Sequence, residues 1–253
     1  MVVRLVQMHV KPDRMIEFQR LYEENAVPAL EQQTRCRYAA LVQNIQNNDE
    51  AISLTLWDNK DDCVAYEESG IYSTLIEQSK HFFIDGEEMR LHLTADAQLE
   101  LAPVTEEPVI KSYTGGDAPE MPGQKDRPSS FMFVRLVKMI VRPGMEQEFI
   151  RTYQEVIRPE LLRLPGCREA YVMKDLDEEN DWISMTIWSR KEDADNHEEG
   201  GSSARLRAKL TPLLSGLYQW KRGVEKNIGK QAITSDDVTV TGYRVLTGKR
   251  LGR

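Results

Sequence analysis

The chain has 253 residues, with 41 acidic and 33 basic side chains and a formal net charge of -8 at pH 7. This length suits two domains of ordinary size, each large enough to bury its own core. Nucleic-acid affinity comes mainly from lysine and arginine that neutralise phosphates, so the acidic balance argues against such a partner. The start, Met1–Arg4, lacks the regions of a signal peptide, and no apolar run approaches the roughly 18 residues of a spanning helix. We therefore expect a cytoplasmic protein without membrane contact.

The sequence repeats itself at an offset of 131 residues. Residues 4–12, RLVQMHVKP, return as residues 135–143, RLVKMIVRP. The register then holds through further identical pairs, which are Glu17/Glu148, Phe18/Phe149, Tyr22/Tyr153, Pro28/Pro159, Cys36/Cys167, Arg37/Arg168, Trp57/Trp188, Glu67/Glu198 and Glu68/Glu199. A period of this length indicates a duplicated domain and not a solenoid of short repeats.

Each half is predicted to contain a strand, a helix, two strands, a second helix and a last strand. The first strand, residues 131–141 in the second half, is almost continuously apolar, which is typical of a strand buried on both faces. Pro143 and Gly144 then turn the chain into an amphipathic helix, which Pro159 is expected to bend or end. The next two strands are predicted at 36–43 and 51–57 in the first half and at 167–174 and 182–188 in the second.

A capping box predicts where the second helix of the second half begins. Ser189 and Glu192 are spaced so that the hydroxyl and the carboxylate satisfy free amides of the first turn. Residues 58–61 are the acidic equivalent in the first half. These helices are expected to run, with a break at glycine, to about residues 83 and 214, and last strands are predicted near 89–94 and 217–222.

This order of elements is that of the split βαβ, or ferredoxin-like, unit. Two helices cover one face of its sheet and leave the other bare, whereas the apolar first strand predicts burial on both faces. The matching sheet of the other copy is the simplest cover. We therefore predict an α+β fold in which tandem ferredoxin-like (βαββαβ) domains pack sheet to sheet as a pseudo-dimeric α/β barrel. At about 25 cal/mol per Å² of buried apolar surface, isolated halves would be poorly soluble or would dimerise.

The predicted domain boundaries follow the proline and glycine content. Residues 1–102 and 131–225 form the two domains, joined by a Pro/Gly-rich linker at 103–130 and followed by an extension at 226–253. Residues 109–113 of the linker resemble residues 239–243 of the extension. Both are expected to form an extra edge strand laid across the partner half.

The three cysteines are expected to be buried or idle thiols. Cys36 and Cys167 are repeat equivalents, so each belongs to its own half, and Cys63 has no counterpart. Neither Cys36 nor Cys167 has a histidine close in sequence, which argues against a catalytic cysteine. The histidines and cysteines show no metal-ligand spacing, so we predict no metal.

The motif VRLVxMxVxP followed by a Glu-Phe helix, together with CR and then ISxTxWxxK, resembles the antibiotic biosynthesis monooxygenase (ABM) domain family of dimeric α/β-barrel proteins. The resemblance covers residues 2–95 and 132–225. It implies a sheet-to-sheet barrel, and it implies one of several activities: cofactor-independent oxidation of phenolic polyketides and quinols, haem degradation, or no known reaction.

Haem degradation is disfavoured by the residues themselves. Haem degraders of this fold use an asparagine on the first strand, a tryptophan in the second helix and a histidine further along it. The corresponding positions hold Val6 and Val137, Tyr66 and His197, and Ile76 and Arg207. The set is missing from both halves.

A cofactor-free oxygenase needs a dry apolar pocket and a group that favours a phenolate, and in this fold the pocket would lie between the sheet and the helices. Tyr66, Tyr72 and His197, on the second helices, are the candidate catalytic residues. A solvated surface position is the alternative for His197, because Glu198 and Glu199 follow it.

Four residues are candidates for substrate binding. Trp57 and Trp188 end equivalent strands and offer a stacking surface, and the alternative is a core aromatic with a hydrogen-bonded indole. Arg37 and Arg168 offer charge for an anionic group, and the alternative is that they shield the sheet surface. The recurring Glu67-Glu68 and Glu198-Glu199 pairs favour solvated charge, because adjacent helical residues point about 100° apart.

These observations predict a cofactor-independent monooxygenase that acts on a small aromatic or quinol-like compound, with no cofactor. The alternative is a non-catalytic small-molecule-binding or structural protein. The differences between the copies, such as Tyr66 against His197, favour one working half and one structural half. Association into a further homodimer stays open.

Overall fold

The strands and helices follow one another in two similar series. The computed structural model describes residues 1–93, 99–105, 108–115, 132–215 and 238–251. The strands are β1 (Val2–His9), β2 (Cys36–Asn44), β3 (Glu50–Trp57), β4 (Asp85–Leu93), β5 (Leu99–Thr105), β6 (Val109–Gly115), β7 (Phe133–Ile140), β8 (Cys167–Asp175), β9 (Asp181–Trp188) and β10 (Val238–Arg250). The helical segments are η1 (Pro12–Arg14), α1 (Met15–Leu21), η2 (Tyr22–Ala26), α2 (Val27–Glu31), α3 (Lys60–Glu68), α4 (Ile71–Ser79), η3 (Lys80–Phe82), α5 (Glu146–Thr152), η4 (Tyr153–Ile157), α6 (Arg158–Leu162), α7 (Lys191–Glu199), α8 (Ser202–Leu210) and η5 (Thr211–Leu213).

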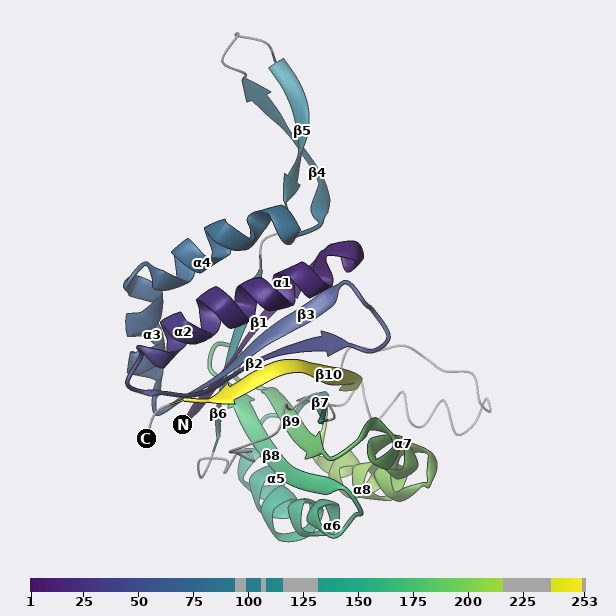
Figure 1. Ribbon diagram of the computed structural model, residues 1–253. Coiled ribbons are helices and arrows are strands. Elements are labelled where there is room, and N and C mark those ends of the chain that lie inside the picture. Colours follow the sequence, from purple (N-terminus) through teal and green to yellow (C-terminus); the bar gives the residue numbers. More distant parts are fainter. Residues whose placement is uncertain (94–98, 106–107, 116–131, 216–237, 252–253) are drawn as a thin grey trace.

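Antiparallel strands from both series form one closed barrel in the order β1-β3-β2-β10-β7-β9-β8-β6. Helices α1 to α4 cover one side of the barrel, and α5 to α8 cover the opposite side (Figure 1). We call residues 1–115 the first lobe and residues 132–251 the second lobe. The prediction of tandem ferredoxin-like units packed sheet to sheet as a pseudo-dimeric barrel is confirmed.

Strand β1 is buried on both faces, as its apolar sequence predicts. Successive side chains of a strand point to opposite faces. Val3 and Leu5 accordingly join the core inside the barrel, whereas Val6 and Met8 join the core beneath the first-lobe helices. Arg4 lies between Val3 and Leu5 on the helix-facing side and is only 2% exposed.

The inside of the barrel is an apolar core to which both lobes contribute. Its buried members are Val3, Leu5, Tyr38, Ala40, Val42, Ile52, Leu54, Leu56, Tyr113, Val134, Leu136, Met173, Ile183, Met185, Ile187, Tyr243 and Val245. Burying a large apolar side chain contributes roughly 1.5–3 kcal/mol, so this shared core binds the lobes tightly. Neither lobe could expose its half of it to water without a large loss of stability.

Strands β6 and β10 join the lobes through backbone hydrogen bonds. β6 pairs with β1 of its own lobe and with β8 of the other, and β10 pairs in the same way with β7 and β2. The hydroxyl of Tyr243, on β10, also donates to Glu50 Oε1 of the first lobe at 2.6 Å. The segments predicted as edge strands therefore close the barrel, and they do lie across the partner half.

The last strand of the first half lies outside the barrel, contrary to the prediction for residues 89–94. β4 pairs with β5, with Leu91 opposite Leu101, in a separate two-stranded sheet. This hairpin projects away from the barrel (Figure 1). Since β6 occupies the position beside β1, the barrel is complete without β4. The corresponding prediction at 217–222 lies outside the described residues.

The first long helix of each lobe contains a π-helical turn just before its proline. The Val27 amide donates to the Tyr22 carbonyl oxygen, and the Arg158 amide donates to that of Tyr153. Proline has no amide hydrogen and crowds the carbonyl four residues earlier, and the wider turn accommodates both effects. The helix therefore continues through Pro28 and Pro159.

The two lobes cap their second helical layer differently. Asn59 caps α3, its Oδ1 accepting from the Asp62 amide at 2.9 Å. The predicted capping box at Ser189 is wrong, because Arg190 is the N-cap of α7 and has no side-chain capping bond. The Ser189 hydroxyl instead accepts from Arg168 Nε at 2.6 Å.

Candidate functional site

Trp57 and Trp188 are buried at equivalent points beneath the helices. The indole Nε1 of Trp57 donates to Thr55 Oγ1 at 2.9 Å, and Trp188 makes the same bond to Thr186. Such a bond satisfies the one polar atom of a buried indole. Both tryptophans are thus hydrogen-bonded core aromatics, and what differs between the lobes is the ring above each of them. Tyr66 lies 5.1 Å from Trp57, and His197 stacks on Trp188 at 5.4 Å between ring centroids.

Arg4 is the most unusual polar residue of the first lobe. Its Nε donates to Glu67 Oε1 at 2.7 Å, but its Nη2 is buried and has no hydrogen-bond partner. Its Cζ lies 4.4 Å from the ring centroid of Tyr72 and 5.8 Å from that of Tyr66. Aromatic faces stabilise a guanidinium in part, yet an unsatisfied buried donor is costly. Arg4 therefore has one strong donor to spare.

Arg4 borders a cavity of about 50 Å³ between the sheet and the first-lobe helices. The lining is mostly apolar and aromatic, and comprises Arg4, Val6, Met8, Phe18, Leu21, Tyr22, Ala26, Leu30, Ser53, Thr55, Tyr66, Tyr72, Leu75, Ile76 and Ser79. The structure thus brings Tyr66 and Tyr72 together, and Trp57 lies behind Tyr66. A dry pocket with few, well-placed polar groups is typical of a small-molecule site.

Tyr22 and Tyr66 of this cavity are neutral at pH 7 and do not act as bases. Burial raises the pKa of Tyr66 well above its ordinary value, and the nearby charge of Arg4 opposes this only in part. Burial likewise raises the pKa of Tyr22, whose hydroxyl shares a 3.0 Å hydrogen bond with Ser53. Arg4 carries the positive charge in this cavity.

The second lobe repeats the buried arginine but supplies it with more partners. Arg135 Nη2 donates to Glu198 Oε2 at 2.6 Å and lies 3.5 Å from Ser203 Oγ, while Arg207 Nη2 donates to Glu198 Oε1 at 2.7 Å. Burial opposes the ionisation of Glu198, but the two arginines hold its pKa below the ordinary value. Arg207 and Ser203 occupy the positions of Ile76 and Tyr72, so two polar side chains stand here where the first lobe has an aliphatic and an aromatic residue, and Glu198 accepts from both arginines.

His197 is buried at 4% exposure, so the solvated surface position considered for it is wrong. Its Nδ1 lies 2.7 Å from Ser202 Oγ, and this hydroxyl donates to the His197 carbonyl oxygen at 2.9 Å. Burial, followed by the charge of Arg135, lowers the pKa of His197 to about 4. The ring is therefore neutral at pH 7 and is a weak base.

The candidate arginines Arg37 and Arg168 lie on the outside, away from the cavity lining. Arg37 donates through Nε and Nη2 to both carboxylate oxygens of Asp58 at 2.7 and 2.6 Å. Arg168 donates to Ser189. These contacts tie each strand to the start of the following helix.

The cysteines are buried free thiols, as predicted. Burial raises the pKa of Cys36 and Cys167 to about 12 and that of Cys63 to about 11, so none is a thiolate at neutral pH. Within the described ranges, no three His, Cys, Asp or Glu side chains come together as a metal site.

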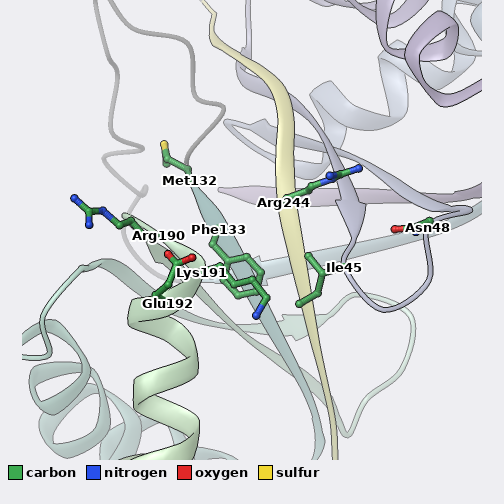
Figure 2. Close-up of a pocket in the computed structure, with 8 residues that line it drawn as sticks. All are labelled: Ile45, Asn48, Met132, Phe133, Arg190, Lys191, Glu192 and Arg244. Carbon is green, nitrogen blue, oxygen red and sulfur yellow. The ribbon is translucent and has the colours of Figure 1, made fainter.

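A larger pocket of about 740 Å³ lies where the lobes meet (Figure 2). Arg190, Lys191 and Arg244 line it together with apolar Ile45, Met132 and Phe133. Two of these cations already have partners, Lys191 pairing with Asp195 and Arg244 donating to Gln43. No buried and unpartnered group of the described chain faces this pocket, so its chemistry is less specific than that of the first-lobe cavity.

The sequence repeat contains a signal that points to Arg4 and its partner. Arg4 and Glu67 recur as Arg135 and Glu198 with the same separation along the chain. The repeated glutamates were expected to be solvated charge. In the structure, one glutamate of each pair, with its side chain 36% or 35% exposed, forms an ion pair with the buried arginine of its lobe.

The barrel of two ferredoxin-like units defines the class of dimeric α/β-barrel proteins, and comparisons with known proteins narrow it. The antibiotic biosynthesis monooxygenase family matches residues 1–78 and 132–209, and the chain belongs to this family. No curated protein matches the chain. None of the helices in the described part of the chain is long and apolar enough to cross a membrane.

Solved structures share the fold over nearly the whole chain. A candidate monooxygenase from Lactobacillus acidophilus NCFM has a TM-score of 0.62 at 9% identity, covering 99% of this chain and 96% of its own. A candidate monooxygenase from Fusobacterium nucleatum subsp. nucleatum has a TM-score of 0.63 at 10% identity, with coverages of 99% and 94%. An anthrone oxidase-like protein has a TM-score of 0.57 at 13% identity, with coverages of 100% and 93%. At such low identity these likenesses establish the fold alone.

Proposed function

We propose that the protein is a cofactor-independent monooxygenase that acts on a small aromatic or quinol-like compound in the first-lobe cavity. The observation that carries the proposal is the buried guanidinium of Arg4, a residue that lines this cavity and whose Nη2 has no hydrogen-bond partner. An anionic oxygen of a ligand would satisfy this donor with a charge-assisted hydrogen bond. Membership of the ABM family supports the same type of reaction.

Oxidation of a phenol by dioxygen requires few groups beyond those of this cavity. While the site is open to solvent, a phenol whose hydroxyl lies beside Arg4 can lose its proton to water, because a charge-assisted hydrogen bond from Arg4 offsets the burial that raises the pKa of Tyr66. Once the site excludes water, the bound phenolate can pass an electron to dioxygen. For a compound of the anthrone type, the ring CH2 becomes C=O, one oxygen atom enters the product and the other leaves as water. The substrate loses all four electrons that dioxygen gains, so no further reductant is needed.

The other candidate residues take smaller parts in this proposal. Tyr66 and Tyr72 offer ring faces and hydroxyl donors to the substrate, and Trp57 supports Tyr66 from behind. His197 and Trp188 belong to the second lobe, where we assign them a structural part. Arg37 and Arg168 are the least supported candidates, because they lie away from the cavity lining.

The test compares matched substitutions in the two lobes. Oxygen uptake is measured with hydroquinones, catechols and anthrones, without added flavin or metal, for the wild type, Arg4→Met and Arg135→Met. Methionine keeps much of the buried length and removes the charge. We expect Arg4→Met to lose about 100-fold or more in kcat/KM, the usual cost of removing a donor to a developing oxyanion, and Arg135→Met to keep turnover. Equal losses in both variants would contradict the assignment to the first lobe.

The alternative is a non-catalytic small-molecule-binding or structural protein. One observation favours it: the cavity of about 50 Å³ is small for an enzyme pocket. Absence of oxygen uptake with every compound of the panel would support this alternative.

A further inference from the structure

The cavity is too small for an aromatic ring in the conformation described. An engineered cavity of roughly 150 Å³ is known to admit benzene, whereas this one holds about 50 Å³. Protein interiors are close-packed, so a ring cannot enter unless part of the wall moves. The wall must therefore contain a movable side chain with free space behind it.

That space lies directly outside the cavity. A groove of about 600 Å³ runs between α4 and the first long helix, and it is lined by Asn25, Ala29, Ser69, Gly70, Ile71, Thr74, Leu75 and Gln78. Leu75 lines the groove and the cavity alike, so its side chain is the partition between them. A leucine changes rotamer within nanoseconds where space permits, and the groove provides that space.

The groove lining suits a neutral compound, because none of its eight residues is charged. The polar contact that crosses it is a hydrogen bond from Asn25 Nδ2 to Gln78 Oε1 at 3.1 Å, exposed to solvent. An exposed neutral hydrogen bond exchanges readily with water. A phenol in its neutral form could therefore pass along the groove and ionise only beside Arg4.

The second lobe has charged residues and a more deeply buried leucine at the same positions. Leu206, the equivalent of Leu75, is only 5% exposed. Glu160 and Lys209 replace Ala29 and Gln78 and form an ion pair at 2.5 Å, and Arg205 replaces Thr74. Three charged residues thus stand where the first lobe has a neutral groove.

We propose that Leu75 is the door of the first-lobe site, through which one neutral aromatic alcohol per chain enters from the groove between α2 and α4. This inference rests on the proposed function for the identity of the ligand. The door itself is a property of the packing, and its test needs no turnover. Leu75 also sets specificity, because the space that it vacates determines how large a ring can bind.

The experiment measures the association of 2-naphthol by stopped-flow fluorescence with the full chain, using the matched variants Leu75→Ala and Leu206→Ala. Leu75→Ala removes the door, and we expect its association rate to rise at least tenfold, with one site per chain. Leu75→Trp should slow association by a similar factor. Leu206→Ala should match the wild type. Leu75→Val and Leu206→Val form a milder pair if an alanine variant does not fold, as judged by thermal unfolding.

Each outcome decides the matter. Faster association in Leu75→Ala alone supports the role of Leu75 as the door. This result would hold even if no compound consumes oxygen, an outcome that would contradict the proposed function but not the door. Equal rates in all three proteins, or equal changes in both leucine variants, overturn the door, even if turnover is observed. Absence of 2-naphthol binding to Leu75→Ala overturns it as well, because the opened cavity should admit the ring.

Discussion

The buried His197 predicts how the free energy of unfolding depends on pH. Its pKa falls from the ordinary value of about 6.5 to about 4, first because burial disfavours the charged ring and then because Arg135 is near. Below pH 6.5, the unfolded chain therefore binds a proton that the folded chain does not bind until about pH 4. The contribution of the neutral ring to stability is complete above pH 6.5 and is lost as the pH falls toward 4.

The size of the effect follows from the two pKa values. A pH of 5 is about 1.5 units below the pKa of the ring in the unfolded chain, so that ring is almost fully protonated. The ring in the folded chain is almost unprotonated at this pH. At about 1.4 kcal/mol per unit, the loss relative to pH 7.5 is about 2 kcal/mol. Urea unfolding at both pH values should show a loss about 2 kcal/mol greater in the wild type than in His197→Phe, which keeps a ring against Trp188.

The matched control is His81→Gln, which removes an exposed histidine and so measures separately the general effect of losing an imidazole. Other groups titrate in the same range, but they do so equally in all three proteins, so the comparison isolates the ring. An equal loss of stability in the wild type and in His197→Phe would refute the view that the second lobe keeps this histidine neutral by burial.

Two further predictions concern the core and the barrel. Thr55→Val removes the acceptor of the buried Trp57 indole, so we expect a loss of about 1–3 kcal/mol in urea unfolding, whereas Thr74→Val, at an exposed threonine, should change little. A fragment of residues 1–115 carries four barrel strands with a bare apolar face, so it should form a homodimer that rebuilds the barrel. Light scattering at micromolar concentration measures its mass, and a stable monomer would contradict this prediction.

Much of the fold could be predicted because the sequence contains two copies of the same domain. The repeat and the doubly apolar first strand together predicted the barrel, and the similarity of residues 109–113 to 239–243 predicted its closing strands. The position of β4 could not be predicted in this way. A strand-like pattern reports burial and backbone preference, but not which of the three strands after α4 will pair with β1. The predicted domain boundaries, cytoplasmic location and further homodimer stay predictions.

The site was harder to predict than the fold, because it depends on contacts between distant elements. The sequence predicts that Tyr66 and Tyr72 lie on the second helical layer, as they do, but it shows Arg4 only as one member of the repeated motif. A single arginine in an apolar strand has no local partner in sequence. Its significance appears only when α3 brings Glu67 to Arg4 Nε and leaves the buried Nη2 without a partner. A charged residue retained at the same place in two apolar strands was the available signal.

The differences between the lobes follow from their being joined in one chain. In a homodimer, any substitution that fills a cavity fills both cavities at once, so a working site cannot be lost from one subunit alone. Tandem duplication removes this constraint. The second lobe has Arg207 beside Glu198, the Glu160–Lys209 ion pair and a buried neutral histidine, all of which consolidate packing. The first lobe has an unsatisfied arginine, a costly feature for a purely structural unit. In the second lobe the corresponding Nη2 donates to Glu198, whereas in the first lobe Glu67 accepts from Nε, so Arg4 Nη2 is the donor that the proposed ligand would satisfy.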